Sequence, residues 1–224
     1  MRRDARRKSR YIILALACAQ FAVAGDPAAN LLGRWRATET SKGGIGAMYE
    51  FRADGTVDFS PGAVVEMPYR VEDNFLIMAG ETQGSEQKTT IEFVGTDKFR
   101  LKPPTGAPGQ TRAVELLRQG TAPDRHNPIV GEWIEHREMG GRQLEAHWLF
   151  SGGGKVLLLI PFVTSHGHFS IRGSAIHMEF LPPSALAQTP MNGTFEVSND
   201  VLVLKLPKRT ESGERIGEYR YARY

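Results

Sequence analysis

Residues 168–180 read His-Phe-Ser-Ile-Arg-Gly-Ser-Ala-Ile-His-Met-Glu-Phe. Apolar and polar residues alternate on both sides of Gly173-Ser174, which is the period of a β-strand with one buried and one exposed face. A two-residue turn at Gly173-Ser174 would join the two runs into a hairpin. In this register three pairs of residues face each other across the strands: Arg172 and Ala175, Ser170 and His177, and His168 and Glu179.

The same pattern extends over most of the chain, which has 224 residues. Turn signals rich in Gly, Asp and Asn recur at roughly the 8–12-residue spacing of all-β folds. They include Gly43-Gly44, Asp54-Gly55, Asp73-Asn74, Gly152-Gly153-Gly154 and Asn199-Asp200. No stretch predicts a helix of more than two turns. Short strands joined by short turns predict an antiparallel all-β meander that closes or stacks to bury its apolar face.

The chain also contains an internal repeat. Leu32-Gly33-Arg34-Trp35 returns as Val130-Gly131-Glu132-Trp133, 98 positions later, and Phe51 returns as Phe150, 99 positions later. Further matches follow in the same order, and their offset changes where the sequence is rich in Gly or Pro, as insertions in loops would produce. A polar segment with two prolines, residues 120–128, separates the copies. We therefore predict a module at 25–124 and another at 125–224.

Each copy opens with Gly-x-Trp, Gly33-Arg34-Trp35 and Gly131-Glu132-Trp133, and continues into a Phe-x-x-x-Gly-x-Val strand start. This pattern resembles the lipocalin (calycin-type) group, especially the small lipocalin-like domains of exported bacterial proteins. The resemblance implies two tandem antiparallel meander β-barrels. It also implies that an arginine of the last strand lies across each tryptophan, Arg118 in the first module and Arg220 or Arg223 in the second. Whether the barrels close separately or share a sheet stays open.

The first 24 residues predict a signal peptide. A start rich in arginine is followed by an apolar run that ends in Ala22-Val23-Ala24, the small residues of a cleavage site. The run is shorter than the roughly 20 apolar residues of a membrane-spanning helix. We expect cleavage after Ala24 and export to the periplasm or the medium. Ala15-Leu16-Ala17-Cys18 loosely resembles a lipobox, so a lipoprotein anchored through Cys18 is the alternative.

Charge and cysteine content exclude several classes of protein. The chain carries 28 basic and 25 acidic residues, but residues 1–24 hold six of the basic residues and one of the acidic ones. The remainder has 22 against 24, a net charge of −2, which argues against binding to nucleic acid. Cleavage would also remove Cys18, the single cysteine, and no later segment is apolar enough to span a membrane.

The second module carries the candidate ligand site. Trp133, Trp148, Phe150, Phe169 and Met178 are expected to line a pocket in its barrel, and Trp148 has no clear aromatic counterpart in the first module. A plain barrel core is the alternative interpretation. The chain has no Gly-x-Ser-x-Gly, His-Glu-x-x-His or Walker motif, and no cofactor is predicted. The leading hypothesis is a non-catalytic protein that carries a small hydrophobic or amphipathic ligand.

Two other functions remain open. All six histidines lie in the second module, and the hairpin would bring His168, His177 and Glu179 onto one exposed face. Two imidazoles and a carboxylate suit zinc or copper, although histidines on a solvated strand are the simpler interpretation. The other possibility is an envelope module that binds a protein partner and no small molecule.

Overall fold

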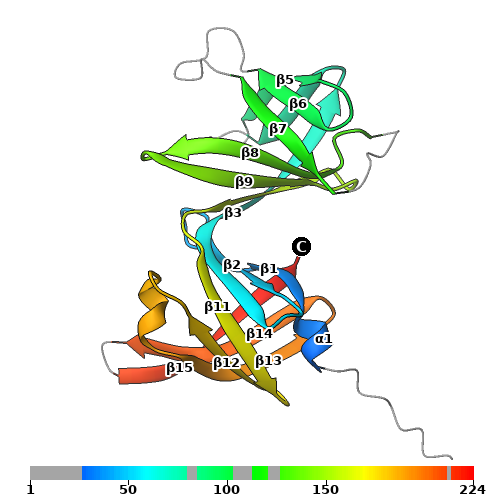
Figure 1. Ribbon diagram of the computed structural model, residues 1–224. Helices are drawn as coiled ribbons and strands as arrows, with labels where there is room; N and C mark the ends of the chain where they lie inside the picture. The colour runs from blue at the N-terminus through cyan, green and yellow to red at the C-terminus, as the bar shows by residue number, and fades with distance from the viewer. Residues whose placement is uncertain (1–26, 80–84, 103–112, 121–126, 211–212) are drawn as a thin grey trace, which may run out of the picture.

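The computed structural model describes residues 27–79, 85–102, 113–120, 127–210 and 213–224 (Figure 1). These residues form an antiparallel sheet of fifteen strands, with a short helix α1 (Pro27–Leu31) and a 3₁₀ turn η1 (Ala185–Gln188). The predicted all-β class is confirmed. No helix in this part of the chain is long and apolar enough to cross a membrane. The predicted leader, with Cys18, lies outside the described residues.

The strands follow one another with few interruptions. Those of the first repeat are β1 (Gly33–Ala37), β2 (Ile45–Phe51), β3 (Thr56–Glu72), β4 (Phe75–Ala79), β5 (Glu86–Phe93), β6 (Lys98–Lys102) and β7 (Val114–Gln119). Those of the second repeat are β8 (Gly131–Met139), β9 (Arg142–Phe150), β10 (Lys155–Pro161), β11 (Ser165–Arg172), β12 (Ala175–Phe180), β13 (Met191–Ser198), β14 (Val201–Thr210) and β15 (Gly213–Arg223).

The sheet closes twice, and both closures use the 17-residue strand β3. The first half of β3 pairs with β2 and β11, and its second half pairs with β4 and β10. Ring 1 therefore runs β1-β2-β3-β11-β12-β13-β14-β15 and returns to β1. Ring 2 runs β3-β4-β5-β6-β7-β8-β9-β10 and returns to β3. Figure 1 shows ring 2 above ring 1, with β3 passing between them.

Neither ring is closed by one repeat alone. Ring 1 combines β1, β2 and the start of β3 with β11–β15 of the second repeat, and ring 2 combines the remaining strands of both repeats. A boundary at residue 124 divides the two sequence copies, but each ring contains strands from both sides of it. The sequence left open whether the two copies close separately or share a sheet. They share a sheet, because β3 belongs to both rings. One physical difference between the copies is that β3 is continuous, whereas its counterpart is interrupted at residues 162–164, between β10 and β11.

Each ring has its own apolar core, and a smaller cluster lies between them. Trp35 and Phe51 are buried in ring 1, while Trp133 and Phe99 are buried in ring 2. The small cluster, called the seam below, consists of Met48, Val64, Leu157 and Leu159. Leu157 and Leu159 alternate along β10 with residues that face the core of ring 2, so both faces of this strand are buried.

A tryptophan and an arginine close one end of each ring. The Nε1 of Trp35 donates to the carbonyl of Leu31, and the Nε1 of Trp133 donates to the carbonyl of Ile129, both at 2.7 Å. The guanidinium of Arg223 lies 4.2 Å from the ring centroid of Trp35. That of Arg118 lies 4.0 Å from the centroid of Trp133. Each arginine thus covers the tryptophan of the other repeat.

This pairing corrects the expected assignment within each module. Arg118 does not cover Trp35, because its strand β7 pairs with β8 and so places Arg118 opposite Trp133. In the second repeat the covering residue is Arg223, whereas Arg220 forms an exposed ion pair with Glu218 at 2.6 Å.

Steric constraints explain why each Gly-x-Trp motif begins with glycine. Gly33 and Gly131 adopt φ values of +117° and +128°, which residues with a side chain rarely adopt. A Cβ atom would lie 2.6 Å from Nη1 of Arg223 at Gly33 and 2.8 Å from Nη1 of Arg118 at Gly131. The absent side chain therefore leaves room for the guanidinium to reach a backbone carbonyl, at 2.6 Å for Arg223 with Leu32.

Candidate binding site

The repeat serves as an internal control, because a feature found in one copy only is a candidate for function. Two features of the second repeat have no counterpart in the part of the first repeat that the structure describes: the strand interruption at 162–164 and the segment 181–190 that carries η1. Both line the same part of the surface. The interruption borders a polar cleft, and both features border an apolar groove next to it.

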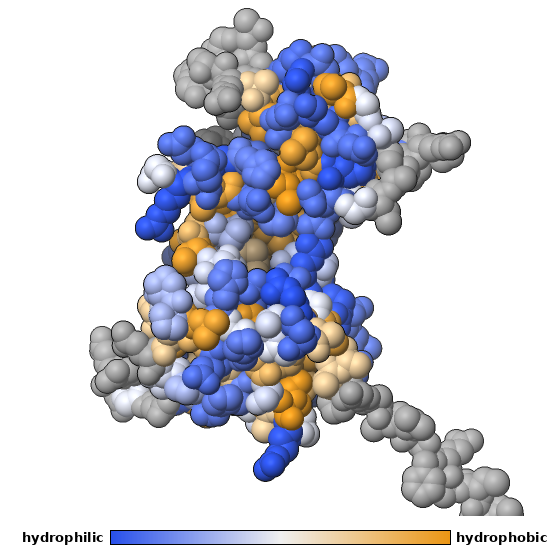
Figure 2. Space-filling view, viewed as in Figure 1, coloured by the Kyte–Doolittle hydropathy of each residue, from blue (hydrophilic) through white to orange (hydrophobic). Residues whose placement is uncertain are grey.

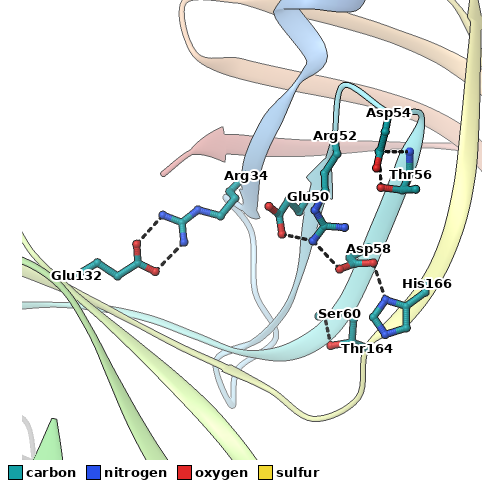
Figure 3. Close-up of polar contacts among 10 residues, drawn as sticks. All are labelled: Arg34, Glu50, Arg52, Asp54, Thr56, Asp58, Ser60, Glu132, Thr164 and His166. Carbon is teal, nitrogen blue, oxygen red and sulfur yellow. Dashed lines mark hydrogen bonds and ion pairs between the residues drawn. The ribbon is translucent and has the colours of Figure 1, made fainter. Parts of the chain in front are cut away.

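The cleft lies between ring 1 and the β8–β9 hairpin of ring 2, and its volume is about 510 Å³. Polar side chains of both repeats line it, and several of their contacts are drawn in Figure 3. The lining residues are Arg34, Met48, Tyr49, Glu50, Asp58, Ser60, Arg142, Gln143, Leu144, Glu145, His147, Pro161, Phe162, Val163, Thr164 and Tyr224.

One wall of the cleft is a cross-strand array on ring 1. Asp58 of β3 faces His166 of β11, with 2.7 Å between Oδ1 and Nδ1, and the hydroxyls of Ser60 and Thr164 lie 2.9 Å apart (Figure 3). Arg52 donates to Oδ2 of Asp58 at 2.8 Å. Burial alone would raise the pKa of Asp58, but the hydrogen bonds from Arg52 and His166 outweigh it and lower the pKa. This carboxylate is therefore held ionised and already has partners.

An ion pair between the rings forms a second part of the cleft. Both terminal nitrogens of Arg34 donate to the carboxylate of Glu132, at 2.6 and 2.7 Å (Figure 3), and Nδ1 of His147 lies 3.0 Å from the same carboxylate. Hydrogen bonds with His147 and Arg34 lower the pKa of Glu132 to about 2. Arg34 also lies 4.9 Å from the ring centroid of Tyr224, whose pKa burial raises to about 12.

The apolar groove adjoins the cleft and has a volume of about 340 Å³. Val163 and Thr164 line both spaces, so the two lie side by side. Leu181 and Leu186 form the side of the groove that belongs to the η1 segment. Ser184 links this segment to the start of β11, because its hydroxyl donates to Ser165 Oγ at 2.7 Å. Apolar surface is visible at the waist between the rings in Figure 2.

The structure does not bring the five predicted pocket residues together. Trp133, Trp148 and Phe150 belong to the core of ring 2, whereas Phe169 and Met178 pack in ring 1. They are separated because β9 and β11, although both from the second repeat, enter different rings. They contribute to the cores rather than to the cleft or the groove.

Trp148 was expected to have no clear aromatic counterpart in the first repeat, but the strand pairing gives it one. Trp148 faces Trp133 across β8 and β9, as Tyr49 faces Trp35 across β1 and β2. Tyr49 is therefore its counterpart. What distinguishes Trp148 is its partner, because its Nε1 donates at 3.0 Å to the buried carboxylate of Glu135.

The hairpin predicted at Gly173-Ser174 is confirmed, with all three predicted pairs in register. The metal site that it suggested is not assembled, because no three His, Cys, Asp or Glu side chains in the described ranges are grouped to hold an ion. His177 instead lies with Nδ1 2.7 Å from Oδ1 of Asn192. Of the six histidines, His126 lies outside the described ranges, His147 lines the cleft, and His166 and His136 contact the cleft carboxylates Asp58 and Glu145.

The residues that the first repeat contributes to the cleft are not among the site residues predicted from the sequence. At the offset of 99 that relates Phe51 to Phe150, Asp58 and Ser60 correspond to Leu157 and Leu159. The leucines are buried in the seam, whereas the aspartate and the serine face the cleft. The sequence did hold one signal for these residues, because a polar residue in one copy aligns with an apolar residue in the other.

Comparison with known proteins yields no relationship. Neither a protein-family model, nor a curated protein, nor a solved structure matches the chain. The lipocalin-like resemblance is carried by the Gly-x-Trp motifs and the strand starts that follow them, and it stays a prediction.

Proposed function

We propose that this is an exported, non-catalytic binding protein for a small amphipathic molecule. Its ligand occupies the groove and the cleft, with an apolar part in the groove and a polar head in the cleft. The site differs from the barrel interior expected from the sequence, because the side chains expected there are packed into two separate cores. Export rests on the predicted leader, and the absence of catalysis rests on the absence of a catalytic motif.

The observation that carries the proposal is that two spaces of different chemistry adjoin each other. Val163 and Thr164 border both the apolar groove, of about 340 Å³, and the polar cleft, of about 510 Å³. Each volume lies within the roughly 300–1,000 Å³ typical of small-molecule sites. A ligand that spans them would need one apolar and one polar end.

Exposed apolar side chains supply a driving force. Val163 is 52% and Leu181 is 46% exposed, and both line the groove. Covering apolar surface yields roughly 25 cal/mol per Å². A ligand tail that covers these side chains therefore removes apolar surface of the protein as well as its own from water.

The test uses the neutral fluorescent probe N-phenyl-1-naphthylamine, whose emission rises in apolar surroundings. We expect saturable binding of one probe per chain, and Leu181→Asp should weaken it at least about tenfold by placing a charge in the groove. Ile216→Asp is the matched control, because Ile216 is 67% exposed on β15 and lines neither space. Equal binding by both variants, or no saturable binding by the unmodified protein, would contradict the proposal.

A further inference from the structure

We infer that the polar head of the ligand is uncharged and rich in hydroxyl groups, as a glycosyl group is. The inference rests on the proposed function and specifies the chemistry that the cleft recognises. It follows from the charge balance of the cleft, from polar groups there that are free to bind, and from the aromatic rings in its lining.

The charges of the cleft are close to balance and are mostly paired. Together with direct partners, the cleft holds three arginines and four carboxylates: Arg34, Arg52 and Arg142, with Glu50, Asp58, Glu132 and Glu145. Arg34 is bound to Glu132, and Arg52 is bound to both Glu50 and Asp58. A cleft without a dominant sign does not concentrate ions of either charge.

An ionic head of either sign would meet a like charge. A carboxylate or phosphate would face Glu50, Asp58 and Glu145, and an ammonium group would face Arg34 and Arg142. A head bound at Arg34, Glu50 or Asp58 would also have to compete with ion pairs that these residues already form. Because burying an unbalanced charge is costly, a head that carries no charge avoids both penalties.

Groups without partners in the cleft include both donors and acceptors. Among the described residues, the side chains of Arg142 and Gln143 and the hydroxyl of Tyr224 form no hydrogen bond or ion pair with another side chain or the backbone. Glu145 is paired with His136 at 3.7 Å, a distance that leaves its carboxylate free to accept a hydrogen bond. Hydroxyl groups both donate and accept, so a polyhydroxylated head could satisfy all four residues at once.

Aromatic rings complete the lining. Tyr49, Phe162 and Tyr224 all border the cleft, and Phe162 is 38% exposed. Sugar rings present apolar C–H faces between their hydroxyl groups, and such faces pack against the electron-rich faces of aromatic rings. The cleft therefore offers contacts to both kinds of surface that a glycosyl group carries.

The inference is tested by calorimetric titration with amphiphiles that share a dodecyl chain. Dodecyl maltoside, tridecanoate and dodecyltrimethylammonium, each below its critical micelle concentration, differ only in the head. We expect maltoside to bind at least about tenfold more tightly than either ionic probe. Its affinity should change less than twofold between 50 and 500 mM salt, since no charge is recognised.

Two variants separate the head from the tail. Tyr224→Phe keeps the ring and removes the hydroxyl, so it should weaken maltoside about three- to tenfold and leave N-phenyl-1-naphthylamine unaffected. Tyr219→Phe, on β15 outside the cleft lining, is the control and should change neither. An ionic probe that binds as tightly as maltoside would overturn the inference while the proposed function stands. No binding by any probe would overturn both.

Discussion

Arg34 and Glu132 are the middle residues of the two Gly-x-Trp motifs, and they bind each other through two hydrogen bonds of 2.6 and 2.7 Å. Equivalent positions of the two repeats therefore meet between the rings. In an association of two identical repeats, this position would bring two like charges together. The opposite charges favour the pairing of the first repeat with the second, which is the pairing that closes both rings.

A charge-reversal cycle tests this interaction. Arg34→Glu should lower the free energy of unfolding by roughly 1–3 kcal/mol, because it leaves a partly buried carboxylate facing another. The double variant Arg34→Glu, Glu132→Arg should recover most of the loss. Urea unfolding measures both. Arg70→Glu breaks more exposed pairs, with Glu72 and Glu86, and should cost clearly less than Arg34→Glu. Equal losses in the single and double variants would show that the pair contributes no specificity.

Stability should depend on pH through Glu132. Its pKa in the folded protein is about 2, below the usual 4.5, so its contribution is present above pH 4.5 and is lost as the pH falls towards 2. The loss should be on the order of 1–3 kcal/mol between pH 5 and pH 2.5. Glu132→Gln should show a correspondingly smaller decrease over this range in urea unfolding. Parallel pH profiles for the two proteins would contradict this role.

The glycines of the two motifs should not tolerate a side chain. Gly33→Ala and Gly131→Ala combine an unfavourable φ with a Cβ atom at 2.6 or 2.8 Å from an arginine nitrogen, so each should cost roughly 2–4 kcal/mol. Gly95→Ala is the control, since Gly95 also has a positive φ, of +74°, but nothing within 4 Å of its Cβ position. It should cost about 1–2 kcal/mol. Thermal unfolding compares the three, and equal losses would mean that the close approach to arginine has no effect.

The seam should contribute to stability like a true core. Leu159 is 1% exposed although it faces away from the core of ring 2, so Leu159→Ala should cost about 2–4 kcal/mol. Val71 is 42% exposed, and Val71→Ala should cost less than about 1 kcal/mol. Denaturant titration measures both. A loss below 1 kcal/mol for Leu159→Ala would show that the rings are not packed together in solution.

Local features of the fold were predictable from the sequence. Period-two alternation indicated the strands, and Gly173-Ser174 set the register of β11 and β12, because a two-residue turn leaves no freedom in the pairing. The repeat indicated which tryptophans and arginines are equivalent. These signals are local or depend on a comparison of the chain with itself.

The partners of the strands could not be predicted in this way. The alternation of apolar and polar residues along β3 is the same whether the strand pairs within its repeat or across repeats. Periodicity therefore could not show that Arg118 and Arg223 each cover the tryptophan of the other repeat. The cleft was missed for a related reason. Asp58 and His166 are 108 positions apart and meet only because β3 pairs with β11. Sites formed by pairing between distant strands depend on topology, which local patterns do not specify.

The most direct test of the exchanged architecture is to cut the chain between the repeats. A protease site introduced between Gly120 and Asn127 allows the purified protein to be cleaved, and size-exclusion chromatography then reports the size of the product. We predict that the two fragments remain a one-to-one complex of unchanged size, because β1–β15, β3–β11, β3–β10 and β7–β8 pairs join them. Fragments that separate without denaturant, each keeping a β-sheet circular dichroism spectrum, would show that each repeat closes by itself and would contradict the account.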